Sequence, residues 1–144
     1  MLNYIVKHTK AYLEEKSKTD RKLIGQFFTP YETAKYMAQL FSIPAQTVIR
    51  ILDPGAGSGV LAAALIERIL KIRGVEKIEL ICYENNSSII PLLESNLSYI
   101  KENTKILLEY EIIEENYITS QGEDFKGLIG AKQRFANYFD CIIG

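Results

Sequence analysis

The sequence predicts a parallel α/β fold, and three observations support this prediction. Short apolar runs alternate along the chain with stretches of helical periodicity. Some of these runs are almost continuously apolar, which is typical of strands buried on both faces of a parallel sheet. The glycine-rich stretch "DPGAGSG" at 53–59 stands directly between a strand-like run and a helical one. This order favours right-handed crossovers and a ligand site at the carboxyl ends of the strands.

Residues 1–46 are predicted to form an N-terminal helical segment. An amphipathic helix is expected from Asn3 to about Lys18; it carries His8, which has no partner evident in the sequence. A second helix is expected from the capping box at 29–32, with Thr29 as its N-cap, and it should run to about residue 41 before Pro44.

Residues 47–144 contain the strands and helices of the predicted sheet. Strands are expected in "VIRILD", "KIELICYE", "KILLEYEIIEENYI" and "FDCIIG". A helix closed by Gly74 should follow the first strand, and a helix with Pro91 in its first turn should follow the second. A loop with a short helix is expected between the last two strands.

Composition limits the classes of function. The chain has 144 residues and a net charge of −1, so it is predicted to be one globular unit without the basic excess of a free-standing nucleic-acid-binding domain. Its apolar runs are shorter than a membrane span and its start does not resemble a signal peptide, so a cytoplasmic location is expected. Cys82 and Cys141 lie in apolar strands without metal-ligand spacing; both are predicted to be buried free thiols.

The glycine turn predicts the chemistry of the ligand. Its glycines at 55, 57 and 59 are spaced G-x-G-x-G, unlike the G-x-G-x-x-G of dinucleotide-binding folds. No Gly-Lys-Ser/Thr follows, which excludes a P-loop. Asp53 precedes the turn, and a carboxylate there suits an ammonium or sulfonium group better than a pyrophosphate.

Two further acidic positions extend this interpretation. Glu84 ends the second strand, where a carboxylate can accept hydrogen bonds from ribose hydroxyls. Asp124 in "GEDF" is a candidate acceptor from an adenine amino group, with Phe125 stacked on the ring; Glu123 beside it makes the choice of acid ambiguous. Each acid has a plain structural alternative, namely solvation or helix capping. Together they fit S-adenosylmethionine better than NAD.

These motifs resemble those of a known enzyme family. "GQFFTP", "ILDPGAGSG", "CYE", "GEDF" and "FDCIIG" are similar to motifs X, I, II, III and the approach to motif IV of amino-group DNA methyltransferases. Motif X before motif I resembles the gamma arrangement of adenine-N6 methylases from restriction–modification systems of the PstI kind. The resemblance spans about residues 25–144. It implies a class I methyltransferase fold, a Rossmann-like parallel sheet that is incomplete here.

The resemblance also implies roles for individual residues. Binding of S-adenosylmethionine is expected to involve, in chain order, Phe27, Thr29, Pro30, Asp53, Pro54, Gly55, Ala56, Gly57, Gly59, Glu84, Asn85, Asp124 and Phe125. The first three and the glycine turn would hold the methionine part, Glu84 the ribose, and the last two the adenine. The implied partner of the full-length protein is duplex DNA with a flipped adenine, and neither a metal nor a membrane is expected.

The catalytic motif of this family does not occur in these 144 residues. Asn-Pro-Pro-Tyr is expected after the fourth strand, because its Asn side chain and a proline carbonyl accept the hydrogens of the adenine amino group. "FDCIIG" ends the sequence at Gly144 and no Asn-Pro-Pro stands elsewhere. The sequence is therefore interpreted as a truncated, cofactor-binding part that is inactive alone and could self-associate through an unpaired sheet edge. Two alternatives stay open: a non-catalytic S-adenosylmethionine-binding module, and a methyltransferase acting on protein glutamine or RNA.

Overall fold

The computed structural model describes residues 1–15, 28–121 and 138–144. In chain order its elements are α1 (Leu2–Glu14), α3 (Tyr31–Gln39), β1 (Val48–Asp53), α4 (Val60–Ile69), β2 (Lys77–Tyr83), α5 (Ile90–Glu102), β3 (Leu107–Ile113), α6 (Tyr117–Ser120) and β4 (Cys141–Ile142). The predicted α/β class is confirmed.

The described strands form one parallel sheet in the order β3-β2-β1-β4. From β1 the chain moves outward to β2 and β3, and it then returns to pair β4 with the other side of β1. The carboxyl ends of all four strands therefore lie at one edge of the sheet, which is where ligands bind in open α/β sheets. β4 is short: only Cys141 and Ile142 pair with β1, although a longer strand was expected.

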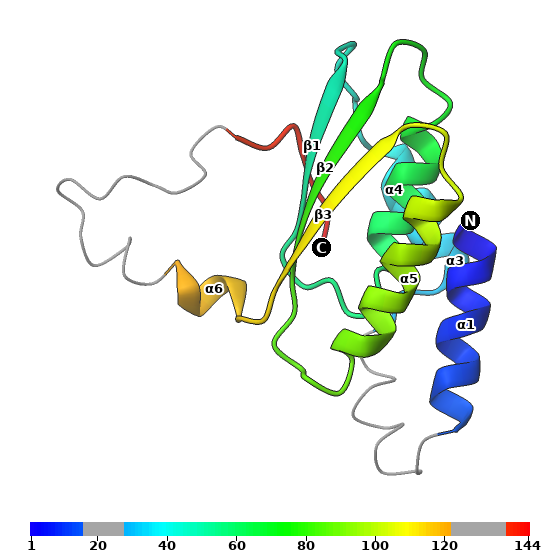
Figure 1. Cartoon of the computed structure of the whole chain (residues 1–144), viewed down its shortest axis with the longest axis vertical. Coiled ribbons are helices and arrows are strands. Elements are labelled where there is room, and N and C mark those ends of the chain that lie inside the picture. The colour runs from blue at the N-terminus through cyan, green and yellow to red at the C-terminus, as the bar shows by residue number, and fades with distance from the viewer. Residues whose placement is uncertain (16–27, 122–137) are drawn as a thin grey trace, which may run out of the picture.

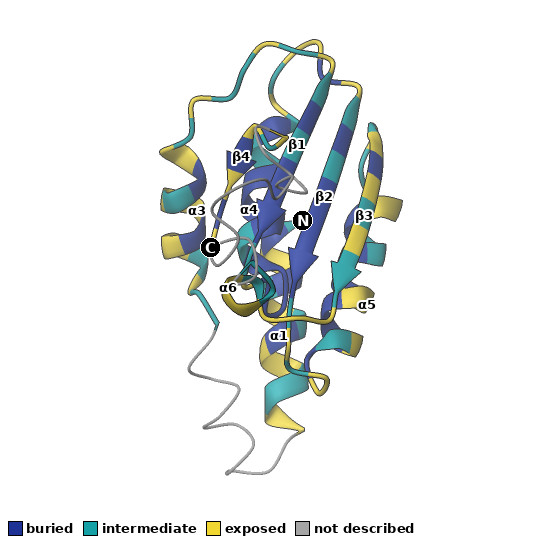
Figure 2. Ribbon diagram, turned by 90° about the vertical axis from the view of Figure 1, so that its left-hand side faces the viewer, coloured by how far each residue is buried: buried dark blue, intermediate teal, exposed yellow. Residues whose placement is uncertain are grey.

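Helices α1, α3, α4 and α5 lie together on one face of the sheet (Figure 1). The main core is enclosed between these helices and that face, and it includes Ile49 and Ile51 of β1. Because strand side chains alternate between faces, Leu52 of β1 belongs instead to a smaller cluster on the opposite face, with Ile81 and Tyr83 of β2. Figure 2 shows β1 and β2 as the most deeply buried strands.

On the face of the sheet opposite the four helices, the amino-terminal halves of the strands carry an ion-pair network. Arg50 of β1 and Lys77 of β2 both pair with Glu79, and Lys77 also reaches Glu109 of β3 at 2.7 Å. Tyr138 donates its hydroxyl to Glu79 at 2.9 Å and lies under the Arg50 guanidinium. This network holds the segment that leads into β4 against the sheet.

Some predicted helix boundaries are confirmed and others are wrong. Pro91 lies in the first turn of α5, as predicted. The capping box at 29–32 does not form: Pro30 is the N-cap of α3, with φ −60° and ψ 153°, and no side chain caps the helix. Extended backbone at Pro30 delays the start of the helix by one residue, which leaves Thr29 outside the capping position. Helix α4 ends at Ile69, before the Gly74 that was expected to close it.

The other predictions about the fold have mixed outcomes. Cys82 and Cys141 are buried free thiols, as predicted. The chain stretch after β3 was expected to continue as a strand, but it turns into α6 at Tyr117. The division at residue 46 stays a prediction; α1 and α3, which precede it, contribute side chains to the same core as α4 and α5.

Candidate functional site

The glycine turn between β1 and α4 adopts backbone conformations that favour glycine. Gly57 has φ 54° and Gly59 has φ 79°, both in the left-handed region. A Cβ on Gly59 would also lie 3.0 Å from Cδ1 of Leu93 on α5, so this glycine permits the close approach of helix and turn. The Ala56 amide donates to the carbonyl of Tyr83, which ties the turn to the end of β2.

Asp53 lies beneath this turn and is fully buried. Its Oδ1 accepts from the Gly55 amide at 3.4 Å, whereas its Oδ2 has no hydrogen-bond partner in the described structure. Burial, together with a smaller contribution from the nearby charge of Glu84, raises the pKa of this carboxyl from 3.8 to about 7. A buried acid with an unsatisfied oxygen is energetically costly, and such groups concentrate at functional sites.

Glu84, the residue after β2, binds the glycine turn directly. Its Oε2 accepts from the Gly57 amide at 2.8 Å and its Oε1 accepts from the Asn86 amide at 2.7 Å. A carboxylate has about four lone-pair positions, so each oxygen can accept one more hydrogen bond from a ligand. Glu84 thus fixes the turn and keeps acceptor capacity.

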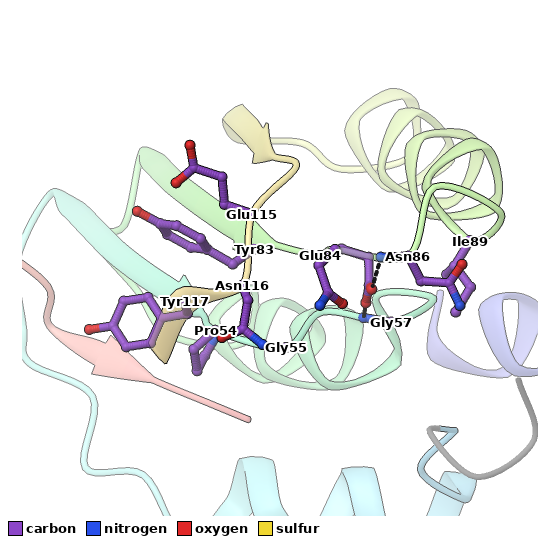
Figure 3. A pocket seen from close by; sticks show the side chains of 11 residues that line it. Pro54, Gly55, Gly57, Tyr83, Glu84, Asn86, Ile89, Glu115, Asn116 and Tyr117 are labelled. Carbon is purple, nitrogen blue, oxygen red and sulfur yellow. Dashed lines mark hydrogen bonds between the residues drawn. The ribbon is translucent and has the colours of Figure 1, made fainter. Parts of the chain in front are cut away.

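A pocket of about 290 Å³ opens where these elements meet (Figure 3). Three strand ends supply its walls: the glycine turn after β1, the segment after β2, and the segment after β3. The lining residues are Pro54, Gly55, Gly57, Tyr83, Glu84, Asn85, Asn86, Ile89, Glu115, Asn116 and Tyr117. In Figure 3, Glu84 points toward Gly57, and Tyr117 and Asn116 border the opposite end from Ile89.

The electrostatics of the pocket favour a cationic ligand. Glu84 and Glu115 contribute carboxylates, and none of the eleven described lining residues is Lys, Arg or His. The ring of Tyr117 packs edge-on against Tyr83, with 5.1 Å between centroids, and supplies an aromatic wall. A pyrophosphate would meet two negative side chains without a balancing cation here.

The structure brings only some of the predicted site residues onto this pocket. Pro54, Gly55, Gly57, Glu84 and Asn85 line it. Buried Asp53, Ala56 and Gly59 lie behind its surface and shape the turn. Thr29 and Pro30 precede α3 and are not lining residues, and Phe27, Asp124 and Phe125 lie outside the described residues.

The sequence interpretation missed Glu115, Asn116 and Tyr117. Glu115 follows the end of β3 almost at once, as the acid Glu84 follows β2, and Asn116 and Tyr117 come directly after it. The predicted strand ran through residue 118, so these residues were not recognised as a segment that follows the end of a strand. Asn116 accepts from the Thr119 amide and caps α6, which holds Tyr117 in the pocket wall.

Comparison with known proteins places this site in a family. A sequence model of the family described as N-6 DNA Methylase matches residues 10–121, more than half of the chain. The chain belongs to the N-6 DNA methylase family. The matched stretch of the chain contains every residue that lines the pocket.

The chain is also similar to one curated protein. The chain is 29% identical over 125 residues to the type II methyltransferase M.BsuBI of Bacillus subtilis. The alignment covers 79% of this chain and 23% of that protein, so the chain spans about a quarter of the relative's length. Among the residues that the structure describes, no helix is long and apolar enough to cross a membrane.

Proposed function

We propose that the pocket binds S-adenosylmethionine and that the full-length protein, of which this chain is the cofactor-binding part, uses it to methylate the N6 amino group of adenine in DNA, as part of a restriction–modification system. The observation that carries this proposal is the acid-lined pocket at the carboxyl ends of β1, β2 and β3. The sulfonium and ammonium groups of S-adenosylmethionine are cations, and they suit a pocket that holds Glu84 and Glu115 and has Asp53 beneath it.

Each part of the ligand has a proposed position. The backbone of the glycine turn offers close approach to the methionine part, since a Cβ on Gly55 would meet no atom within 4 Å. The spare lone pairs of Glu84 suit the ribose hydroxyls. Thr29, Pro30 and Phe27 keep their predicted role at the methionine end, and Asp53 is proposed to act through its field and the shape of the turn rather than by contact, because it is fully buried.

The adenine end of the pocket has two sets of candidates. Asp124 and Phe125 are the prediction from the sequence and lie outside the described residues. We propose Asn116 and Tyr117 in their place, because both line the pocket and lie within the family match. Tyr117→Ala should then weaken S-adenosylmethionine binding about tenfold, a typical loss for one aromatic stacking partner. Phe125→Ala is the matched control, and the reverse ranking would favour the sequence prediction.

The acceptor is proposed as duplex DNA with its target adenine flipped out of the stack, since the amino group is otherwise inaccessible inside a duplex. Family membership supports this acceptor over protein glutamine and RNA. When the full-length protein is offered S-adenosylmethionine labelled in its methyl group together with duplex DNA, RNA and protein, the transferred label should appear as N6-methyladenine in DNA. Label in RNA or protein instead would contradict the proposal. A cytoplasmic location is part of the same proposal.

Self-association through β4 is also proposed. In the described part of the sheet β4 is an edge strand, paired only with β1, and the side chain of Ile142 on it is 56% exposed. An exposed edge of this kind offers unpaired backbone groups to a second chain.

A further inference from the structure

Two consecutive hydrogen bonds, one buried and one partly buried, join the N-terminal helix to the glycine turn on the side away from the pocket. Asn96 on α5 is fully buried, and its Nδ2 donates to the Ser58 carbonyl at 2.8 Å. Its Oδ1 lies 2.6 Å from Nδ1 of His8 on α1. Three segments that are remote in the sequence thus meet at one amide side chain, and none of these three residues lines the pocket.

The chemistry of the partners fixes the direction of both hydrogen bonds. The Ser58 carbonyl can only accept, so the Asn96 NH₂ group must face it and the Asn96 carbonyl must face His8. His8 therefore carries a proton on Nδ1, a condition that both its neutral Nδ1–H form and the imidazolium meet. No partner for His8 was evident in the sequence, and this contact gives it a specific polar role.

The position of Ser58 gives the network a link to the site. Ser58 lies between Gly57 and Gly59, the two turn residues with left-handed backbone, and Gly57 donates its amide to Glu84 on the pocket side. Glu84 binds the turn on the side that faces the pocket, and Asn96 binds it on the opposite side. A carbonyl that loses a buried partner incurs a desolvation cost, which the turn can reduce by rotating its peptide planes.

We propose that Asn96 is a positioning residue for the cofactor turn and that His8 acts through it. Asn96 presents a fixed donor to the Ser58 carbonyl, which keeps the Gly57 amide aligned with Glu84 and preserves the shape of the pocket wall. His8 fixes the rotamer of Asn96 from the opposite side. Helix α1 is thereby a component of the cofactor site, although the family match begins only at residue 10.

Substitutions in the 144-residue chain separate positioning from mere stability. Asn96→Leu removes both hydrogen bonds at similar size; we expect the dissociation constant for S-adenosylmethionine to rise about tenfold, because a buried carbonyl is left without a donor. His8→Leu should raise it about threefold, and His8→Asn, whose amide can place a donor near the Nδ1 position, should restore it. The double variant Asn96→Leu/His8→Leu should match Asn96→Leu alone, since His8 acts through Asn96.

The matched control is Ser98→Ala on the same helix. It removes the hydrogen bond between the Ser98 hydroxyl and the Tyr110 hydroxyl of β3, at 3.0 Å, without touching the turn. Its dissociation constant should equal that of the wild-type chain, whatever its melting temperature. If Asn96→Leu does not fold, the comparison of His8→Leu with His8→Asn decides the question.

Amide hydrogen exchange gives a second readout that needs no ligand. In Asn96→Leu and His8→Leu the amides of Gly57 and Gly59 should exchange faster relative to those of β3, and in Ser98→Ala they should not. Unchanged turn exchange with unchanged affinity in the folded variants would overturn the inference. The affinity readout rests on the proposed function: if the wild-type chain binds no S-adenosylmethionine, that function is contradicted and turn exchange alone decides the role of Asn96.

Discussion

Glu84 holds the glycine turn in place before any ligand is bound: its Oε2 accepts a 2.8 Å hydrogen bond from the backbone amide of Gly57. The second oxygen accepts from the Asn86 amide at 2.7 Å, so one side chain connects the turn after β1 with the loop after β2. A ligand that binds Glu84 therefore meets a carboxylate whose position is already fixed, which lowers the ordering cost of binding.

Substitution of Glu84 should weaken S-adenosylmethionine binding at least about tenfold, because charged hydrogen bonds are worth about 1.5–3 kcal/mol each. Glu84→Gln should be nearly as harmful as Glu84→Ala, since its NH₂ group would face one of the two backbone amides. Calorimetric titration measures the effect, with Glu94→Ala on the exposed side of α5 as the control. An affinity that survives both changes would remove Glu84 from the site.

Asp53 should make stability depend on pH. Its pKa is about 7 in the folded protein and 3.8 ordinarily, so the native state retains a proton that the unfolded chain releases. Stability should therefore fall as pH rises from about 4 to about 7 and change no further above that range. The unfolding free energy of Asp53→Asn should equal that of the wild-type chain at about pH 4. At about pH 8 it should exceed the wild-type value by up to about 4 kcal/mol.

Urea unfolding of both chains at about pH 5 and about pH 8 measures this difference. Glu94→Gln controls for the loss of one exposed carboxylate and should show no such change with pH. A difference between Asp53→Asn and the wild-type chain that stays constant with pH would mean that Asp53 keeps its ordinary pKa.

Two glycines of the turn should respond to alanine in opposite ways. Gly59→Ala should lower the unfolding free energy by about 1–3 kcal/mol, because φ is 79° and the new Cβ would lie 3.0 Å from Leu93. Gly55→Ala should leave stability nearly unchanged, since nothing lies within 4 Å of its Cβ, and should weaken S-adenosylmethionine binding. Thermal unfolding and calorimetry separate the two effects, and full affinity in Gly55→Ala would place the ligand elsewhere.

The edge of the sheet should control self-association. Ile142→Lys places a charge on β4 and should shift any concentration-dependent dimer toward the monomer. Sedimentation over a range of concentrations measures this shift. Tyr36→Lys on α3 is the control, because its side chain is 62% exposed and lies outside the strand edge. Dimerisation that persists in Ile142→Lys would show that another surface is used.

The sequence was most informative where local pattern and burial agree. β1 and β2 were predicted correctly because their apolar runs are bounded by the glycine turn and by Glu84. The end of β3 was missed because Tyr117 and Ile118 add strand-forming residues after the polar stretch 114–116, so the strand was extended to residue 118. In the structure the Asn116 side chain instead accepts from the Thr119 amide and caps α6. The capping box did not form because the backbone of Pro30 is extended, so the helix begins one residue later than predicted.

The sequence predicted the acidic residues of the site, but it did not predict the contacts that support them. Asp53 and Glu84 stand at strand ends, a position that fold topology alone makes significant. Asn96 and His8 are 88 residues apart, and no local pattern shows that they meet behind the turn. The position of Asp53 was predictable, but its complete burial, which raises its pKa, arises from the packing of the folded chain and is not evident from its neighbours in the sequence.

The most direct test of the account is a calorimetric titration of the 144-residue chain with S-adenosylmethionine and, separately, with NAD. The acid-lined pocket predicts saturable one-to-one binding of S-adenosylmethionine, weakened by Glu84→Ala, and no binding of NAD, whose pyrophosphate would face Glu84 and Glu115. Binding of NAD, or an absence of S-adenosylmethionine binding by the folded wild-type chain, would contradict it.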